Sequence, residues 1–181
     1  IGGLSTRQEI IIWTDVGLPS MRYIGSPYYF SFTEVAKGMS MISPNAAVNA
    51  NGRIFFMDRG DFYSYAGSVQ KLQCPVLSTV FDDLDLGQRN KVVAGHNPDF
   101  SEVMWFYPSE SGSGENDRYV IYNYEDNVWY TDTLVRGAWS QANTKSYPLA
   151  PSIISKNLGG NPLTTTTAST SNVSISSTNH G

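Results

Sequence analysis

The stretch FSEVMWFYPSESGSGENDRYVIYNYEDNVWYTDTL, residues 100–134, decides the fold. It holds three apolar, aromatic-rich runs, residues 103–107, 119–124 and 128–131, separated by polar residues. Such runs are typical of β-strands, and the turns between them predict an antiparallel meander. The middle run has apolar or aromatic residues on both faces. This pattern predicts a strand that is covered on both sides, as in stacked or radially packed sheets.

The residues before this stretch repeat the pattern. Residues 9–13, 20–24 and 28–33 predict three strands separated by Gly/Pro turns, and residues 34–43 fit either a helical turn or a loop. Residues 46–50, 53–57, 61–65 and 68–72 predict four strands. Between the first two of these, Asn51-Gly52 is a strong hairpin signal, because a type I′ turn needs positive φ at both central residues. Residues 75–84 predict a short helix, and residues 89–96 a strand that leads through a turn at residues 97–99 into the opening stretch.

We therefore predict an all-β fold of antiparallel four-stranded meanders that resemble propeller blades, whose repeats span roughly 40–50 residues. Residues 1–44 form a partial, blade-like meander and a linker, and residues 45–151 form two blade-like units. Residues 152–181 form a flexible tail rich in Ser, Thr and Asn. The tail is expected to be disordered or extended, because it has too few apolar residues to offset the entropy of ordering.

Composition narrows the range of functions. The net charge is −4, whereas nucleic-acid recognition needs a basic patch, so DNA is expected to pass this protein without specific binding. The single cysteine, Cys74, excludes an intrachain disulfide and a cysteine-rich zinc site, and its apolar surroundings predict a buried structural thiol. The chain contains no run of 18 apolar residues, so we predict no membrane-spanning helix. The start at Ile1 without methionine leads us to expect a piece of a larger protein or a processed product.

The sequence carries no recognisable catalytic motif. The acidic run at residues 82–87 has partial calcium-loop spacing, but Ala94 stands where a bidentate glutamate should close the loop. His96 and His180 are the only histidines, and the chain has no Gly-x-Ser-x-Gly nucleophile elbow. We therefore predict no catalytic, cofactor-binding or metal-binding residue, and hence no enzyme.

One alternative concerns glycans. Acidic side chains gather around the polar loop at residues 109–117, and nearby aromatic side chains are of the type that stacks on sugar rings. The candidate glycan or interface contacts are Trp105, Tyr107, Glu115 and Asp117. The other interpretation of these acids is that they only keep the loop soluble.

Several segments together resemble a known family. They include Trp13-Thr-Asp15, residues 20–25 (SMRYIG), residues 52–58 (GRIFFMD), residues 102–108 (EVMWFYP) and residues 115–124 (ENDRYVIYNY). With Trp129 and residues 134–139 (LVRGAW), they resemble the C-terminal part of tail proteins of tailed bacteriophages, of the nozzle or tail-tubular-B kind. The resemblance covers most of residues 9–151.

The resemblance implies a β-propeller in a virion structural protein of the tail. Six copies would form a ring below the head-to-tail adaptor, through which the genome is ejected. The implied partners are other copies, the adaptor and the fibre proteins, with host surface glycan as a further contact and no membrane. The alternative function is a glycan-binding or glycan-degrading β-domain of a phage tail. The chain is far shorter than members of the family, so blades folded alone would leave sheet faces bare.

Overall fold

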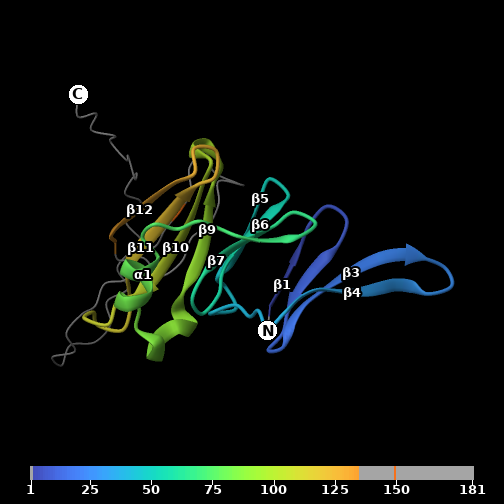
Figure 1. Ribbon diagram of the computed structural model, residues 1–181, viewed down its shortest axis with the longest axis horizontal. Coiled ribbons are helices and arrows are strands. Elements are labelled where there is room, and N and C mark those ends of the chain that lie inside the picture. The colour runs from blue at the N-terminus through green and yellow to red at the C-terminus, as the bar shows by residue number, and fades with distance from the viewer. Residues whose placement is uncertain (1, 135–148, 150–181) are drawn as a thin grey trace, which may run out of the picture.

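The computed structural model describes residues 2–134 and residue 149, and the structural statements below refer to these residues. They form three antiparallel four-stranded sheets in chain order, with little helix (Figure 1). The prediction of an all-β fold made of four-stranded meanders is therefore confirmed. The predicted tail at residues 152–181 lies outside the described residues, as do residues 135–148.

The first sheet has the order β1-β2-β3-β4. Its strands are β1 (Gly2–Ser5), β2 (Ile10–Trp13), β3 (Gly17–Gly25) and β4 (Tyr29–Lys37). The sequence predicts only three strands here, because the glycine-rich β1 has little strand propensity of its own. The last strand also runs on into residues 34–37, for which the sequence favours a helical turn or a loop. Cross-strand pairing of Ala36 and Lys37 with Leu18 and Gly17 determines their conformation instead.

The second sheet follows the prediction closely. Its strands are β5 (Ala47–Ala50), β6 (Arg53–Met57), β7 (Phe62–Tyr65) and β8 (Val69–Lys71), in that order. Asn51 and Gly52 have φ angles of 55° and 90°, as the predicted type I′ turn requires. The hairpin signal in the sequence therefore identifies the connection between β5 and β6 correctly.

The third sheet has the order β12-β11-β10-β9. Its strands are β9 (Val93–Asn97), β10 (Glu102–Pro108), β11 (Asn116–Asn123) and β12 (Val128–Thr133). The segment before it contains α1 (Leu77–Asp83) and the 3-10 helix η1 (Leu86–Lys91), and η2 (Pro98–Phe100) follows β9. Residues 89–91, predicted as strand, therefore belong to η1. This turn begins where the Asp85 carboxylate accepts a hydrogen bond from the Gly87 backbone at 2.8 Å.

The three sheets are arranged radially, with their first strands next to one another. The Asn49 side chain in β5 donates a hydrogen bond of 2.7 Å to the Ser5 carbonyl in β1. On the other side, the Ala94 backbone N–H in β9 donates to the Asn45 carbonyl at 2.7 Å, just before β5. Contacts between β1 and β5 and between β5 and β9 join neighbouring sheets, like the inner strands of adjacent propeller blades. The described residues form no closed ring.

The second sheet lies between the other two, and its central strand explains how they are held together. Ile54 and Phe56 of β6 pack toward the first sheet, whereas Phe55 and Met57 pack toward the third. All four side chains are fully buried. Such two-sided burial is also present in β11, where Val120 packs into the inner core while the next residue joins a cluster on the outer face. The prediction of strands covered on both sides is therefore confirmed.

Candidate functional site

Hydrogen-bonding side chains gather in a groove between the first and second sheets. Two adjoining cavities of about 430 Å³ and 630 Å³ open there, and both are lined by Glu9, Arg22, Tyr65 and Gly67. The smaller cavity also has Arg7, Gln8 and Asn51 in its wall, and the larger one has Ser31, Thr33, Glu34 and Val69. We call these two cavities together the inter-sheet groove.

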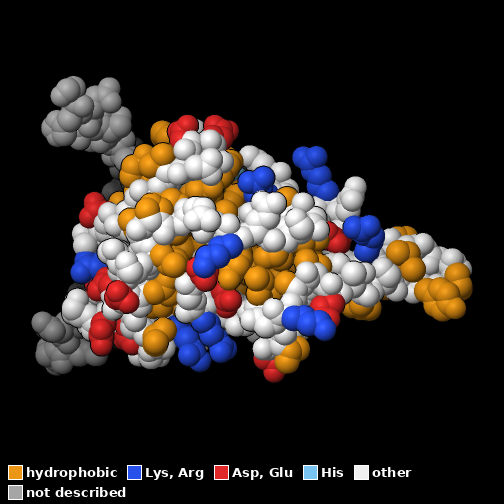
Figure 2. All heavy atoms as spheres, viewed as in Figure 1, with side chains coloured by type: hydrophobic (Ala, Val, Ile, Leu, Met, Phe, Trp, Pro, Cys, Tyr) orange, Lys and Arg blue, Asp and Glu red, His pale blue; other side chains and the backbone are white. Residues whose placement is uncertain are grey.

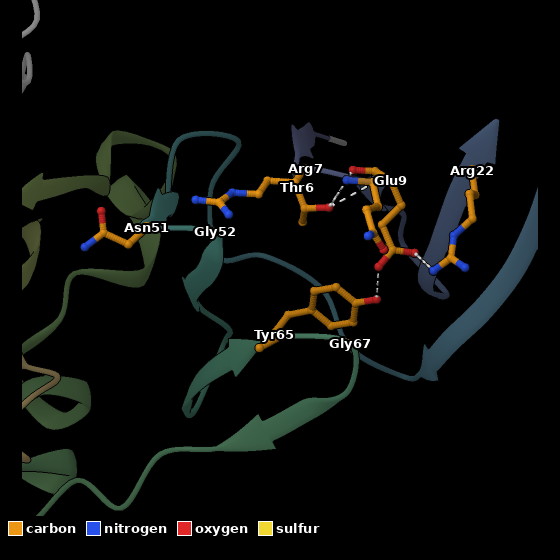
Figure 3. Close-up of a pocket in the computed structure, with 10 residues that line it drawn as sticks. Thr6, Arg7, Glu9, Arg22, Asn51, Gly52, Tyr65 and Gly67 are labelled. Atoms are coloured by element: carbon orange, nitrogen blue, oxygen red, sulfur yellow. Dashed lines mark hydrogen bonds and ion pairs between the residues drawn. The ribbon is translucent and has the colours of Figure 1, made fainter.

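Glu9 is the central residue of the groove (Figure 3). The Tyr65 hydroxyl donates a hydrogen bond of 2.5 Å to Glu9 Oε1, and Arg22 Nη2 lies 3.5 Å from Glu9 Oε2. The Glu9 side chain is 9% exposed, so its charge is largely withdrawn from water. Because both carboxylate oxygens have partners, one carboxylate links the turn before β2 to β3 and β7.

The turn before β2 places Glu9 in this position. The Thr6 hydroxyl oxygen accepts a hydrogen bond of 3.2 Å from the Glu9 backbone N–H, and the same hydroxyl donates to the Glu9 carbonyl at 3.0 Å. Thr6 Oγ1 also accepts from the Gln8 backbone at 3.3 Å. Such side-chain bonds to a neighbouring backbone are the ordinary way in which threonine closes a short turn. The turn thereby directs the Glu9 side chain toward the second sheet.

The ionisable side chains of the groove are joined to one another by a hydrogen bond and by ion pairs. Burial raises the pKa of Tyr65 to about 12, and the hydrogen bond to the Glu9 carboxylate and its negative charge act in the same direction. Tyr65 therefore keeps its proton near neutral pH. The second acid of the larger cavity, Glu34, forms an ion pair of 3.4 Å with Lys37. Both acids of the described groove thus have cationic partners, and neither is positioned as half of an unoccupied acid–base pair.

Two of the four residues singled out by the sequence lie in the core of the protein. Trp105 is fully buried, and its indole N–H donates a hydrogen bond of 3.0 Å to the Ala46 carbonyl. Its ring lies 4.8 Å from that of Phe62, centroid to centroid. Tyr107 is likewise buried, and burial raises its pKa to about 12. Both side chains thus contribute to packing between the second and third sheets.

The other two residues, Glu115 and Asp117, hold the loop between β10 and β11. Glu115 Oε1 accepts a hydrogen bond of 2.7 Å from Lys91 Nζ, which also donates to the Gly114 carbonyl at 2.6 Å. Asp117 accepts from the Ser109 backbone at 2.8 Å and from its hydroxyl at 2.7 Å. The loop predicted to be solvated is therefore anchored at both ends. The structure does not bring these acids into the inter-sheet groove with Glu9.

The remaining chemistry-bearing residues have structural surroundings. His96 is buried, its Nε2 lies 3.1 Å from the Tyr124 hydroxyl, and burial lowers its pKa. Cys74 packs partly against the core, and burial raises its pKa to about 11. Asp83, in the acidic run, forms an ion pair of 3.1 Å with Arg118. Among the described residues, no group of three or more His, Cys, Asp or Glu side chains is placed to hold a metal ion.

The inter-sheet groove could not be found from sequence patterns. Glu9 and Tyr65 are separated by 56 residues, and no motif connects them. The only local signal is Thr6 three residues before Glu9, which indicates a turn and not a site.

Comparison with known proteins adds no relative. No protein-family model matches this chain, and no curated protein is significantly similar to it. In the described part of the chain, no helix has the length and apolar character needed to cross a bilayer.

Proposed function

We propose that this protein is a structural component of a bacteriophage tail, in which several copies form a ring or nozzle through which the genome passes. The observation that carries the proposal is the radial arrangement of three four-stranded sheets, with β1, β5 and β9 side by side. This arrangement is of the blade-on-blade type that the resemblance to tail nozzle proteins implies. The proposal extends to the adaptor and fibre proteins as neighbours in the virion.

The packing supports a mechanical role. Aromatic side chains fill both interfaces between sheets: Phe56 lies 5.4 Å from Trp13 on one side, and Phe62 lies 5.0 Å from Trp129 on the other. Large aromatic side chains dominate core energetics and pack densely. Sheets joined in this way resist shear relative to one another, which is what a wall around moving DNA requires.

The charge is consistent with a passage that does not retain DNA. The net charge is −4, and sequence-independent affinity for DNA depends on Lys and Arg that displace counterions from phosphates. In the described residues, the cations Arg22, Lys37, Lys71, Lys91 and Arg118 each lie within 4 Å of a carboxylate. Pairing reduces the positive potential available to a phosphate backbone.

The test is the size and location of the assembly. Mass photometry of the full-length protein at nanomolar to micromolar concentration should show a ring-sized oligomer, and gold-labelled antibody should mark the tail in electron micrographs of virions. A stable monomer at micromolar concentration, together with no label on the tail, would overturn the proposal. Label on the tail without a ring would restrict the role to a non-ring component.

A second candidate function, glycan binding, is favoured by the lining of the inter-sheet groove. Arg7 and Gln8 place a guanidinium and an amide group at the wall of the 430 Å³ cavity, and such groups form hydrogen bonds with sugar hydroxyls. A glycan array that includes host capsule and lipopolysaccharide tests this function. Binding that Arg7→Ala and Gln8→Ala abolish would support it, and no binding by the full-length wild type would end it.

A further inference from the structure

The hairpin formed by β3 and β4 projects beyond the rest of the described chain (Figure 1). Its strands have nine residues each, whereas the strands of the second sheet have three to five. At about 3.3 Å per residue, nine residues span roughly 30 Å. A neighbouring sheet of the size of the second sheet would cover only the base of this ribbon. The distal half needs a different partner.

The distal half is apolar and exposed. Figure 2 shows hydrophobic side chains covering the projecting end of the molecule. The exposed residues there are Tyr23, Ile24, Tyr28, Tyr29, Phe30 and Phe32, each between 51 and 79% exposed. Soluble monomers rarely expose contiguous apolar patches larger than a few hundred Å². A cluster of this kind therefore indicates an interaction surface.

The strand register places the larger apolar residues on one face of the ribbon. Tyr23 pairs with Phe30, and Met21 pairs with Phe32. Directly paired residues in an antiparallel ribbon point to the same face, and residues two apart along a strand share that face. Tyr23 and Phe30 also contact one another edge to face, with ring centroids 5.7 Å apart. We call the surface formed by Met21, Tyr23, Phe30 and Phe32 the apolar hairpin face.

The opposite face of the ribbon is polar, and its residues contact or line the inter-sheet groove of the same chain. Arg22 pairs with Ser31, and Ser20 pairs with Thr33. Arg22 forms the ion pair with Glu9, and the other three residues line the 630 Å³ cavity of the inter-sheet groove. A ribbon inserted into a bilayer would meet lipid on both faces, which does not suit this polar face. A ribbon that is apolar on one face and polar on the other is suited to docking on another protein.

We propose that the apolar hairpin face, together with the tip residues Ile24, Tyr28 and Tyr29, is the surface on which a second copy of this chain docks. A whole aromatic side chain presents about 200 Å² for burial. The five exposed aromatic residues of the hairpin, at their exposed fractions, therefore offer roughly 600 Å² of apolar area. A standard interface buries about 800 Å² per partner, so the apolar hairpin face and the tip together supply most of what a specific contact needs.

Charge also favours a second copy. No residue from Tyr23 to Thr33 carries a charged side chain, whereas the whole chain has a net charge of −4. Two copies of an acidic protein repel one another wherever like charges meet. A contact made through an uncharged ribbon avoids this repulsion, and its salt dependence should be weak.

This inference rests on the proposed function in one respect, namely that the copies form a ring. The docking surface itself is identified from the exposed apolar residues of the hairpin. A ring needs a head-to-tail contact, in which a surface of one copy meets a different surface of the next. The apolar hairpin face of each copy then reaches across to its neighbour.

The experiment compares two variants of the full-length protein with the wild type. The test variant is Tyr23→Thr/Phe30→Thr/Phe32→Thr, because threonine keeps strand propensity while it removes the aromatic area. The control variant is Val16→Thr/Phe100→Thr, which removes exposed apolar side chains outside the hairpin. Urea unfolding should show both variants folded. We expect the concentration for half-assembly to rise about a hundredfold or more in the test variant, and to change less than about threefold in the control.

A photocrosslinker at Phe32 identifies what the hairpin contacts. In a mixture of isotopically light and heavy protein, mixed light–heavy cross-links are expected, and cross-links only within one chain would overturn the proposal. A ring that the test variant leaves intact overturns this inference and leaves the proposed function standing. A smaller oligomer that the test variant dissociates supports the inference and contradicts the ring. A monomeric wild type whose hairpin binds neutral phosphatidylcholine vesicles would overturn the inference in favour of a lipid surface.

Discussion

The hydroxyl of Tyr65 donates a hydrogen bond of 2.5 Å to Glu9 Oε1 and thereby joins the second sheet to the first. Tyr65 lies in β7 and Glu9 directly precedes β2, and the two residues meet inside the inter-sheet groove. Because Arg22 approaches the other oxygen of the same carboxylate, Glu9 balances its charge inside the protein. The substitution Tyr65→Phe removes this contact by deleting a single oxygen atom.

Removing that oxygen should destabilise the protein. Tyr65→Phe leaves Glu9 Oε1 without its donor in a side chain that is only 9% exposed, so the free energy of unfolding should fall by about 1–3 kcal/mol. Tyr63→Phe is the matched control in the same strand, where the ring stacks on Phe56 at 5.4 Å. Urea-induced unfolding measures both variants, and equal losses would contradict the role assigned to the Tyr65 hydroxyl.

The same contact predicts a loss of stability at alkaline pH. The pKa of Tyr65 is raised from 10.0 to about 12 in the folded protein, so the folded state holds this proton more tightly than the unfolded state. The stabilisation is fully present below about pH 10 and is lost as the pH rises from there through about 12. Free energies of unfolding measured across this range should fall less steeply for Tyr65→Phe than for the wild type. Parallel curves would contradict the prediction.

Cys74 should react slowly with thiol reagents. Burial raises its pKa from 9.0 to about 11, so the reactive thiolate is scarce near pH 8. We expect the native protein to react with Ellman's reagent at least about tenfold more slowly than the urea-unfolded chain. Raising the pH toward 10 should accelerate the native reaction. A native rate equal to the unfolded rate would show that the thiol is neither buried nor shifted.

A side chain at the second position of the turn between β5 and β6 should destabilise the protein. Gly52 has a φ of 90°, where a residue with a Cβ is strained, so Gly52→Ala should lower the free energy of unfolding by about 1 kcal/mol or more. Gly60 is the control, because it has open space around its Cα and no positive φ. Gly60→Ala should be neutral or slightly stabilising. Thermal and urea unfolding measure the difference, and similar losses at both positions would contradict the turn geometry.

The two loop acids should differ in their effect on stability. Asp117 accepts two hydrogen bonds from Ser109, so Asp117→Asn should cost about 1–2 kcal/mol. Glu115 and Lys91 are more than a third exposed, and the loss of such a pair in Glu115→Gln should cost less than about 1 kcal/mol. Urea unfolding of the two variants checks this order, and the reverse order would contradict it. If the full chain binds host glycan and both variants abolish binding at unchanged stability, the loop acids are ligand contacts instead.

Much of the fold could be predicted from local sequence patterns. Near-continuous runs of apolar and aromatic residues mark β6, β7, β10 and β11, and Asn51-Gly52 identifies a hairpin because few other residue pairs adopt its φ angles. β1 was not predictable in this way, since Gly2-Gly3-Leu4-Ser5 has little strand propensity and is strand only because it pairs with β2. Residues 89–91 were predicted as strand but belong to the 3-10 helix η1, because the hydrogen-bonded turn that begins at Asp85 continues through them.

For the candidate site residues too, the sequence reveals the residue types but not their contacts with distant parts of the chain. Acids and aromatic residues near one loop are visible in the sequence, but their burial is not. Trp105 is placed in the core by its contacts with Ala46 and Phe62, both more than 40 residues away in the chain. The groove around Glu9 depends on a partner 56 residues away, which no local pattern reveals.

The sequence by itself determined most of the strands, the turns between them and the meander order of the second and third sheets, because backbone conformation and short-range pairing depend on neighbouring residues. Only the tertiary structure decided which faces of those strands are covered. The residue run of β6 is buried on both sides because two other sheets pack against it, whereas the equally apolar run of Tyr28, Tyr29, Phe30 and Phe32 stays exposed because no described segment lies over it. Hydrophobicity is a property of each residue, but burial depends on segments distant in the chain or on another molecule.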